Sequence, residues 1–384
     1  MQNTLTRNAI LPLAFTGLTV LSVPVAAYEI DIDIDQNPET RETLELYGVI
    51  RLSVDYADSD LGDTPEDQSI GLTDGSVGLS SNTTLFGLRG SYGLADEPYK
   101  VVWQLEQKFN PDNDGGDTLG TRDTFLGLQT PVGLFRAGHM DTPYKRMGLN
   151  STIYSSTVGD PHAIIGKSSQ SPARLDLRAQ NAIQWNHGVG GFQLAALYSM
   201  DGQRSLEDTS DRFIDNNDGD LYSLSASYAL KNLTFMGTYE NWSEAFGGEI
   251  KAWRAGIKYQ GTRTTVGAMY GDIDTDLSAA AGTLSREEYA VFARYKLTPR
   301  FLIGTQWARA GESDFALGDD GADQYSVGAY YLPYRPVALH VVATMTDNDD
   351  NGRYGTADYA HGDRVSTVRG GSPFALSVGA QYSF

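Results

Sequence analysis

Apolar and polar residues alternate along much of this chain, most clearly at its carboxyl-terminal end. From Phe374 to Phe384 every second residue is apolar, and the residues between them are small or polar. A period of two predicts a β-strand with one apolar and one polar face. Because a membrane barrel must pair its last strand with its first, an alternating final strand that ends on an aromatic residue favours such a barrel over a soluble sandwich.

Alternating segments of about ten residues recur along the rest of the chain, and this length lets a tilted strand cross a bilayer. Their even number is typical of bacterial outer-membrane barrels. The sequence therefore predicts an all-β fold, a sixteen-stranded antiparallel transmembrane β-barrel, in which the last strand lies beside the first. The predicted strands are 44–56, 79–94, 98–110, 121–130, 133–141, 176–187, 190–200, 220–230, 233–245, 249–260, 262–273, 286–297, 300–311, 322–333, 336–347 and 373–384.

The connections between these segments form two alternating sets. The turns of the first set are short and contain Gly, Pro or Asn: 94–98, 130–133, 187–190, 230–233, 260–262, 297–300 and 333–336. The second set is polar and mostly long: 57–78, 111–120, 142–175, 201–219, 246–248, 274–285, 312–321 and 348–372. Short turns on one side of the membrane and longer loops on the other are the arrangement of outer-membrane barrels.

Alternation also assigns the two faces of each strand. In 44–56 we expect Ile50 and Val54 to face lipid, and Arg51 and Asp55 to face inward. The inward positions of several other strands are also small, polar or charged. This pattern predicts a water-filled lumen instead of a packed core.

The amino-terminal region has the pattern of a secretory signal. Residues 1–27 contain one charged residue, Arg7, then an apolar stretch, and they end in Val25-Ala26-Ala27, which suits a signal peptidase. We expect residues 1–27 to be a signal peptide and Tyr28 to begin the mature chain. Residues 28–43 form an acidic extension that is expected to be mobile or to lie along a strand edge, and 44–384 form the barrel.

Composition and motifs narrow the function. The formal net charge is −20, one unit more negative once Arg7 is removed, which makes nucleic acid an improbable partner. Cysteine is absent, so no disulfide framework or thiolate metal site is expected. No catalytic or nucleotide-binding motif is found, and the five His residues are scattered singly. We therefore predict that the protein is not an enzyme, although sequence leaves open a Ser–His pair across the barrel.

Several motifs carry a resemblance to a known family. They are Thr84–Gly90 (TLFGLRG), Arg122–Leu128 (RDTFLGL), Gly133–His139 (GLFRAGH), Asn181–Trp185 (NAIQW) and Gly190–Phe192 (GGF). In their order and spacing they resemble strands of the Gram-negative trimeric porins, and the resemblance covers nearly the whole mature chain. It implies a general-diffusion channel in the outer membrane of a Gram-negative bacterium, which passes small hydrophilic solutes and ions. It also implies a homotrimer surrounded by lipid and lipopolysaccharide, and a role for Phe384 in assembly.

The resemblance also implies where the channel is narrow. In this family the third loop, here 142–175, folds inward, and its acidic side chains face arginines of the wall. Leu85 stands where many relatives carry a wall arginine, so we expect a less basic constriction than usual. The constriction candidates are Arg51, Arg89, Arg122, Arg178 and, as the loop acid, Asp160.

One external loop resembles a calcium-binding loop. Asp347, Asp349, Asn351 and Asp358 occupy most ligand positions of a twelve-residue loop, with Asp in place of the final Glu. Two helices do not flank it, so a solvated acidic loop is the alternative to weak Ca²⁺ binding. We expect no other cofactor.

Three further expectations concern assembly and selectivity. We expect Gly48, Gly127 and the neighbourhood of Gly87 to face outward and to let subunits approach closely. Acidic loops and Leu85 predict a modest preference for cations in dilute electrolyte, opposed by the wall arginines. General diffusion has two alternatives. One is a solute-specific channel, in which aromatic rings near Tyr47, Tyr144 and Tyr154 stack on the solute. The other is a structural barrel with a plugged lumen.

Overall fold

The computed structural model of this chain describes residues 28–30, 40–60, 75–112, 119–167, 174–200, 219–245, 248–276, 283–314, 318–357 and 360–384. For 28–30, 244–245 and 283 it describes the backbone alone. The predicted signal peptide, most of the acidic extension and Asp358 lie outside the described residues.

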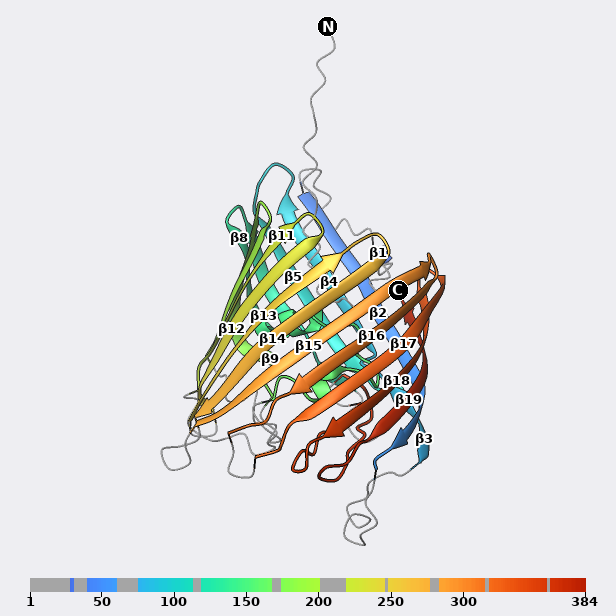
Figure 1. The fold of residues 1–384 in the computed structure, drawn as a ribbon. Helices are drawn as coiled ribbons and strands as arrows, with labels where there is room; N and C mark the ends of the chain where they lie inside the picture. Colours follow the sequence, from blue (N-terminus) through green and yellow to red (C-terminus); the bar gives the residue numbers. More distant parts are fainter. Residues whose placement is uncertain are drawn as a thin grey trace.

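The described residues form a single sheet of nineteen strands and two short helices (Figure 1). The strands are β1 (Tyr28–Ile30), β2 (Thr40–Asp58), β3 (Ser76–Ser81), β4 (Leu85–Leu94), β5 (Lys100–Phe109), β6 (Leu119–Thr121), β7 (Thr124–Thr130), β8 (Gly133–Asp141), β9 (Arg178–Val189), β10 (Phe192–Ser199), β11 (Leu221–Leu230), β12 (Leu233–Ala245), β13 (Gly248–Gln260), β14 (Thr264–Asp276), β15 (Thr283–Thr298), β16 (Phe301–Ala310), β17 (Ala322–Tyr334), β18 (Val337–Asn348) and β19 (Phe374–Ser383). The helices are α2 (Pro143–Asn150) and the 3₁₀-helix η1 (Pro161–Ala163). Neither is long and apolar enough to cross a membrane.

The sheet closes on itself, because β19 pairs antiparallel with β2 from Phe374 opposite Asp58 to Ser383 opposite Val49. Two positions in the wall are each filled by a pair of short strands, β3 with β4 and β6 with β7. Apart from β1, the strands therefore occupy sixteen wall positions. The predicted sixteen-stranded antiparallel barrel is confirmed, as is the pairing of the last strand with the first.

The strand β1 lies on the edge of β2 just beyond the end of β19. Phe384 exchanges backbone hydrogen bonds with Gly48, and Tyr28 then pairs with Leu46. Three residues of the acidic extension therefore continue the line of the last strand.

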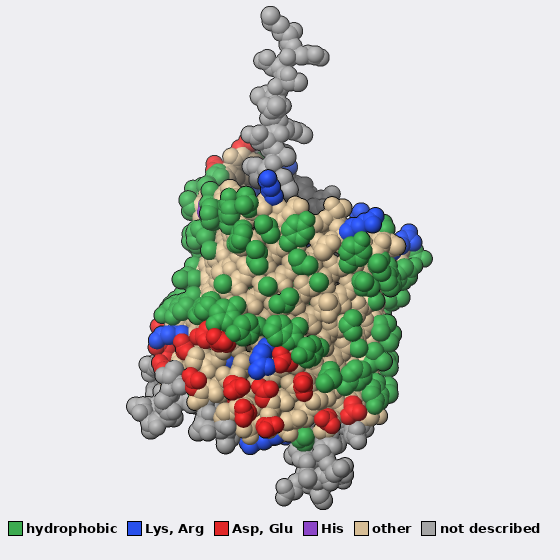
Figure 2. All heavy atoms as spheres, viewed as in Figure 1, with side chains coloured by type: hydrophobic (Ala, Val, Ile, Leu, Met, Phe, Trp, Pro, Cys, Tyr) green, Lys and Arg blue, Asp and Glu red, His purple; other side chains and the backbone are tan. Residues whose placement is uncertain are grey.

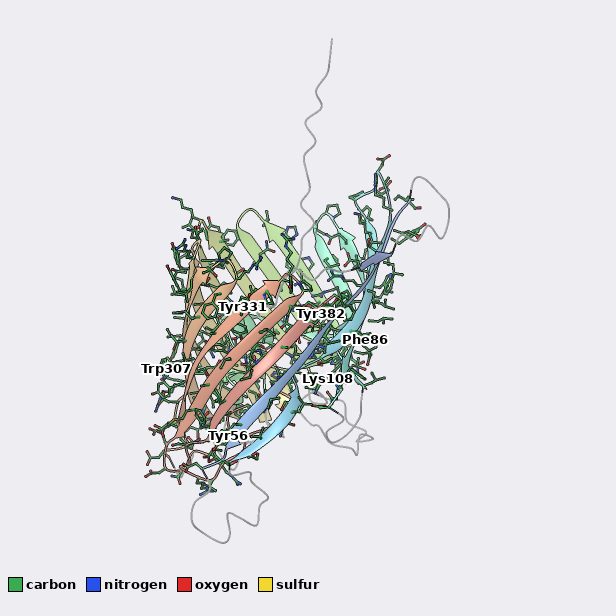
Figure 3. The ribbon with its side chains drawn as sticks, turned by 90° about the vertical axis from the view of Figure 1, so that its right-hand side faces the viewer. Tyr56, Phe86, Lys108, Trp307, Tyr331 and Tyr382 are labelled. Carbon is green, nitrogen blue, oxygen red and sulfur yellow. The ribbon has the colours of Figure 1, made fainter. Side chains whose placement is uncertain are left out.

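The outer face of the wall is apolar, as the alternation predicts. Ile50, Val54 and Val378 are exposed, whereas Arg51 and Asp55 are buried on the opposite face. Figure 2 shows hydrophobic side chains across the wall and acidic side chains below them, where the strands lead into the long loops. Aromatic residues mark both borders: Figure 3 labels Tyr331 and Tyr382 toward the end with the short turns and Tyr56 toward the other end.

An aromatic row follows the border near the long loops. The rings of Trp253, Tyr270, Tyr289 and Trp307 lie on four consecutive strands, β13 to β16, with neighbouring centroids 5.0–6.4 Å apart. Amphipathic rings at this level are the aromatic girdle of a membrane barrel. The girdle fixes how deeply the wall sits in the bilayer.

The inner face differs from the sequence prediction, because part of it is a packed apolar core. The buried clusters join inner wall residues such as Trp242 and Ile273 to residues that follow β8, such as Tyr144 and Ile164. The lumen is therefore filled on one side by protein, and the polar inner residues are concentrated elsewhere.

The glycines invoked for subunit contact do not lie open on the outer face. Gly87 and Gly127 face inward, where Tyr47 covers Gly87 and the Arg136 side chain lies against Gly127. Gly48 faces outward but lies beneath the ring of Phe384, which would be 2.5 Å from an added Cβ. Their role is to make room for side chains of the same chain.

Replacing Gly48 with Ala should weaken closure of the barrel. The new methyl group would stand 2.5 Å from the Phe384 ring and 2.9 Å from the Leu85 carbonyl oxygen, so both neighbours must move. Overpacking of this kind costs about 1–3 kcal/mol. We expect a lower temperature for the loss of the folded form, measured by heat-dependent gel mobility and circular dichroism.

Gly237→Ala is the matched control, since its added Cβ would meet nothing closer than 3.9 Å. If Gly48→Ala melts at the same temperature as Gly237→Ala, the close packing of the Phe384 ring on Gly48 does not stabilise the closed barrel.

Candidate functional site

Residues 142–167, which follow β8, are called the inner segment because they lie against the inner face of the wall. The helix α2 begins at Thr142, whose side chain accepts a hydrogen bond from the Lys145 backbone N–H, and it contacts β10, β11, β12 and β13. Further along, the Ile153 N–H donates to the Gln306 side chain at 2.9 Å. These wall partners lie on the face opposite the exposed apolar residues.

A sealed polar network fixes this segment to the wall. The Arg254 guanidinium donates to both oxygens of Asp176 at 2.6 and 2.9 Å and to Glu288, and it stacks on Tyr144 with its carbon 3.9 Å from the ring centre. Glu288 also accepts from the Tyr144 hydroxyl at 3.1 Å and from the Gly166 N–H at 2.7 Å. The charged members are at most 2 % exposed, so this network is structural and does not touch the passage.

Burial and charge both act on these groups. Burial raises the pKa of the Tyr144 hydroxyl well above its usual value, so it stays protonated and can donate. Burial opposes ionisation of Asp176, but the neighbouring cations, Arg254 foremost through its charge and its hydrogen bonds, together outweigh it and lower the pKa of that carboxyl. The network therefore keeps its hydrogen bonds across the physiological pH range.

A second group of charges, here called the basal cluster, lies at the start of the inner segment. Arg178 Nε lies 2.7 Å from Asp123 and 3.3 Å from Asp141. Arg146 binds Asp123 at 2.8 Å, and Lys145 binds Asp141 at 2.8 Å. This group joins β8, β9, α2 and the break between β6 and β7.

The basal cluster continues along the wall through two further charges. Arg122 Nε lies 2.6 Å from Glu106, which also accepts from the Tyr47 hydroxyl at 3.0 Å. We count Arg122 and Glu106 as members of the basal cluster. It then holds four basic and three acidic side chains.

Three β-bulges bring these residues together. Between the pairs Gln107–Thr121 and Gln104–Phe125, two residues of β5 oppose three residues that include Arg122 and Asp123. The extra residue lets two adjacent side chains both turn inward, which a regular strand forbids.

The other two bulges flank Arg51 and Arg178. Residues 50–51 oppose 82–84, with Thr83 at φ +55°, and His139 opposes 180–181, with Asn181 at φ +48°. Three of the four arginines predicted for the constriction, Arg51, Arg122 and Arg178, therefore lie next to an irregular pairing, whereas Arg89 lies in a regular one.

The three arginines of the basal cluster are more exposed than its acids, whereas the side chain of Lys145 exposes 7 %. Arg122, Arg146 and Arg178 expose 15, 21 and 15 % of their side chains, whereas Glu106, Asp123 and Asp141 expose 12, 8 and 8 %. The acids are used to hold the arginines, so the surface presented to solvent is basic.

Further inward cations extend this basic surface around the wall. They are Arg51, Lys108, Lys258 and Arg294, none of which has a carboxylate within ion-pair distance among the described residues. Arg51 donates to the Gln381 side chain and to the Thr83 carbonyl oxygen, and Lys258 donates to a backbone oxygen of the inner segment. Arg122 interacts electrostatically with both Arg51 and Lys108.

Two predicted site residues lie apart from the basal cluster. Arg89 pairs with Glu45 at 2.6 Å, and nearly half of its side chain is exposed. Asp160 has no exposed surface; its carboxylate accepts from the backbone N–H groups of Ser156 and His162 and caps η1. The structure thus uses Asp160 to fold the inner segment.

The predicted calcium ligands are bound to different partners. Asp347 accepts from the Ser372 hydroxyl, Asp349 lies 3.4 Å from Arg309, and the Asn351 amide donates to a backbone oxygen. Within the described ranges, no group of three or more His, Cys, Asp or Glu side chains is arranged to hold a metal ion.

A closed membrane-spanning barrel with a partly filled, polar-lined interior defines a channel of the outer-membrane class. Residues 14–351 match the family model described as Gram-negative porin, and the chain belongs to this family. It is therefore an outer-membrane channel for the diffusion of small hydrophilic solutes.

Solved structures share this fold. An anion-selective porin from Comamonas acidovorans superimposes with a TM-score of 0.73 at 18 % identity, over 90 % of this chain and 100 % of that one. The outer-membrane protein OmpT of Vibrio cholerae gives 0.67 at 14 % identity, over 89 and 98 %. OmpF of Salmonella typhi, in complex with daunomycin, gives 0.60 at 15 % identity, over 89 and 98 %. No curated protein matches the chain.

Replacing Arg254 with Gln should release the inner segment from the wall. Removing one partner of a sealed ion pair leaves buried charges uncompensated and costs about 3–5 kcal/mol. We expect faster proteolysis within the inner segment and a lower melting temperature, followed on purified protein in detergent.

Arg309→Gln is the control, because its pair with Asp323 is partly exposed and such pairs contribute about 0–1 kcal/mol. Equal effects of the two substitutions would contradict an anchoring role for Arg254.

Proposed function

We propose that the inner segment is the loop that narrows the channel, and that the constriction favours small anions. The observation that carries this proposal is the exposed basic surface of the basal cluster and its continuation along the wall. A solute in a narrow passage with low-dielectric walls feels such fixed charges strongly. The channel remains passive and general.

This proposal reverses the cation preference expected from the sequence. That expectation relied on the acidic composition, on the acidic loops and on Leu85 in place of a wall arginine. Asp160, Asp176 and Glu288 are sealed inside the packing. Acidic groups at the loops are exposed to water, where salt screens them over about 8 Å.

One structural relative also favours an anion preference. One of them is described as an anion-selective porin, and it superimposes over nearly all of this chain. At 18 % identity this likeness shows the fold alone, so the charges of this chain carry the argument.

The buried tyrosines argue against a solute-specific stacking track. Tyr144 and Tyr154 have no exposed surface, and Tyr47 exposes 8 % of its own. Rings that solute cannot reach do not bind it, which favours general diffusion. The same burial isolates the His162–Asp160 pair from any substrate, and we propose no catalytic activity.

We also propose a homotrimer, with the face of β19, β2, β3 and β5 at the subunit contact. Exposed aliphatic residues on this face include Val378, Val54, Leu79 and Leu105. On β14 to β16 the outer face instead ends in the aromatic girdle and charges such as Glu287 and Arg309, which suits lipid and lipopolysaccharide. A relative in the same fold is described in a trimer form.

Neutralising the exposed arginines should remove the anion preference. We expect chloride over potassium permeability, from reversal potentials across planar bilayers, to fall about threefold in a variant carrying Arg122→Gln, Arg146→Gln and Arg178→Gln. Arg89→Gln, outside the basal cluster, is the control and should change it little. Cation preference of the unmodified channel would reject the proposal.

The anion preference should also fall as the pH rises through 8. Burial, with a further contribution from Arg178, lowers the pKa of Lys145 to about 8, while Asp141 opposes this shift. Lys145 is therefore charged below this pH and neutral above it, so the basal cluster loses one positive charge between pH 7 and pH 9. Reversal potentials in the Lys145→Met variant should lack this step; a step of equal size in the variant would assign it to another group.

A further inference from the structure

The described part of the last external loop, 349–357 and 360–373 between β18 and β19, folds into the barrel instead of standing clear of it. Tyr354, Thr356, Ala357, His361 and Val365 are buried, although they belong to a polar loop. A β-bridge between Thr356 and Val365 gives the described part of the loop its own hairpin shape. Buried loop residues in a wide barrel mean that the loop covers inner surface that would otherwise face water.

One side of this loop rests on the inner segment. The Ala357 N–H and the Thr356 hydroxyl both donate to the Val158 carbonyl oxygen, at 3.2 and 3.0 Å. Ala357 and Val365 share an apolar cluster with Ile153, Tyr154 and Val158 of the inner segment and with Phe292, Leu302, Tyr330, Val342 and Ala375 of the wall. Two loops far apart in the sequence thus form one packed body inside the barrel.

The other side of the loop is bound to the wall at the break between β3 and β4. The Thr83 hydroxyl donates to the Ala360 carbonyl oxygen at 2.6 Å, and the Gly362 N–H donates to the Asn82 side chain at 3.2 Å. His361 Nε2 lies 3.0 Å from the inward carboxylate of Asp55. The bulge opposite Arg51 therefore also presents the partners of this loop.

We propose that the last loop is a second constricting segment, latched to the wall by the His361–Asp55 pair, and that it limits conductance together with the inner segment. This rests on the proposed constriction but not on its ion preference. Because the latch ties the loop to β2 of the wall, its loss should let the loop move out of the mouth and widen the passage.

The surroundings of the latch seal it from water. His361 faces Asp55 from β2, the backbone of Asp363 on its own loop, and His340 from β18. The side chains of His361 and Asp55 are only 1 and 8 % exposed, so removing either one leaves the other as a buried polar group without this partner.

The test measures single-channel conductance in planar bilayers for His361→Gln, Asp55→Asn and the double variant. We expect each single variant to raise conductance about 1.5-fold, and the double variant to add nothing further. His187→Gln, at a short turn and stacked on Trp185, is the matched control and should behave as the unmodified channel.

A disulfide between the two loops tests the proposal without depending on how well the latch variants fold. The chain has no Cys, so Val158→Cys with Ala357→Cys can join the two loops where their backbones are hydrogen bonded. Oxidation should leave the conductance of the otherwise unmodified channel nearly unchanged and cancel the increase caused by His361→Gln. Conductance that is insensitive to both the latch variants and the cross-link would overturn the proposal, while reversal potentials report separately on the anion preference.

Discussion

The hydrogen bonds between β19 and β2 are the constraint on which the rest of the structure depends. Lipid offers no partner for a backbone N–H or C=O group, so a sheet that crosses a membrane must have no free edge. Closure at Phe384 and Gly48 meets this requirement. It also encloses a space too wide for the inward side chains of sixteen strands to fill, and that space is where the loops fold.

Where the loops meet the wall, the pairing of the wall strands is irregular. The bulges beside Arg51, Arg122 and Arg178 each insert one residue and turn polar groups inward. Since neither Arg nor Asp can face lipid, the adjacent pair Arg122–Asp123 in an alternating segment was a sequence signal for such a bulge. Arg122 was predicted as a site residue from the sequence, whereas its neighbour Asp123 was not.

The wall could be predicted from the sequence because lipid and strand geometry act on every second residue. That rule places Ile50 outside and Arg51 inside with no knowledge of distant residues. The inner segment follows no such rule. It is held by Arg254, Asp176 and Glu288, which come from three regions of the chain. Only the folded structure shows that the charge of Asp176 is neutralised by an ion pair with Arg254. Arg146, in α2 of the inner segment, was missed for the same reason. Lys258 and Arg294 lie at inward positions of predicted strands, where alternation alone places them, but they were not named as candidates.

The overall charge of the chain therefore says little about the charge that a solute meets. A carboxylate in an external loop is screened by salt, and a carboxylate sealed beside an arginine is cancelled by its partner. What remains is the set of cations that the acids position but leave partly exposed, above all Arg122, Arg146 and Arg178. An acidic protein can in this way build a basic passage, because its acids serve as the scaffold that holds its arginines in place.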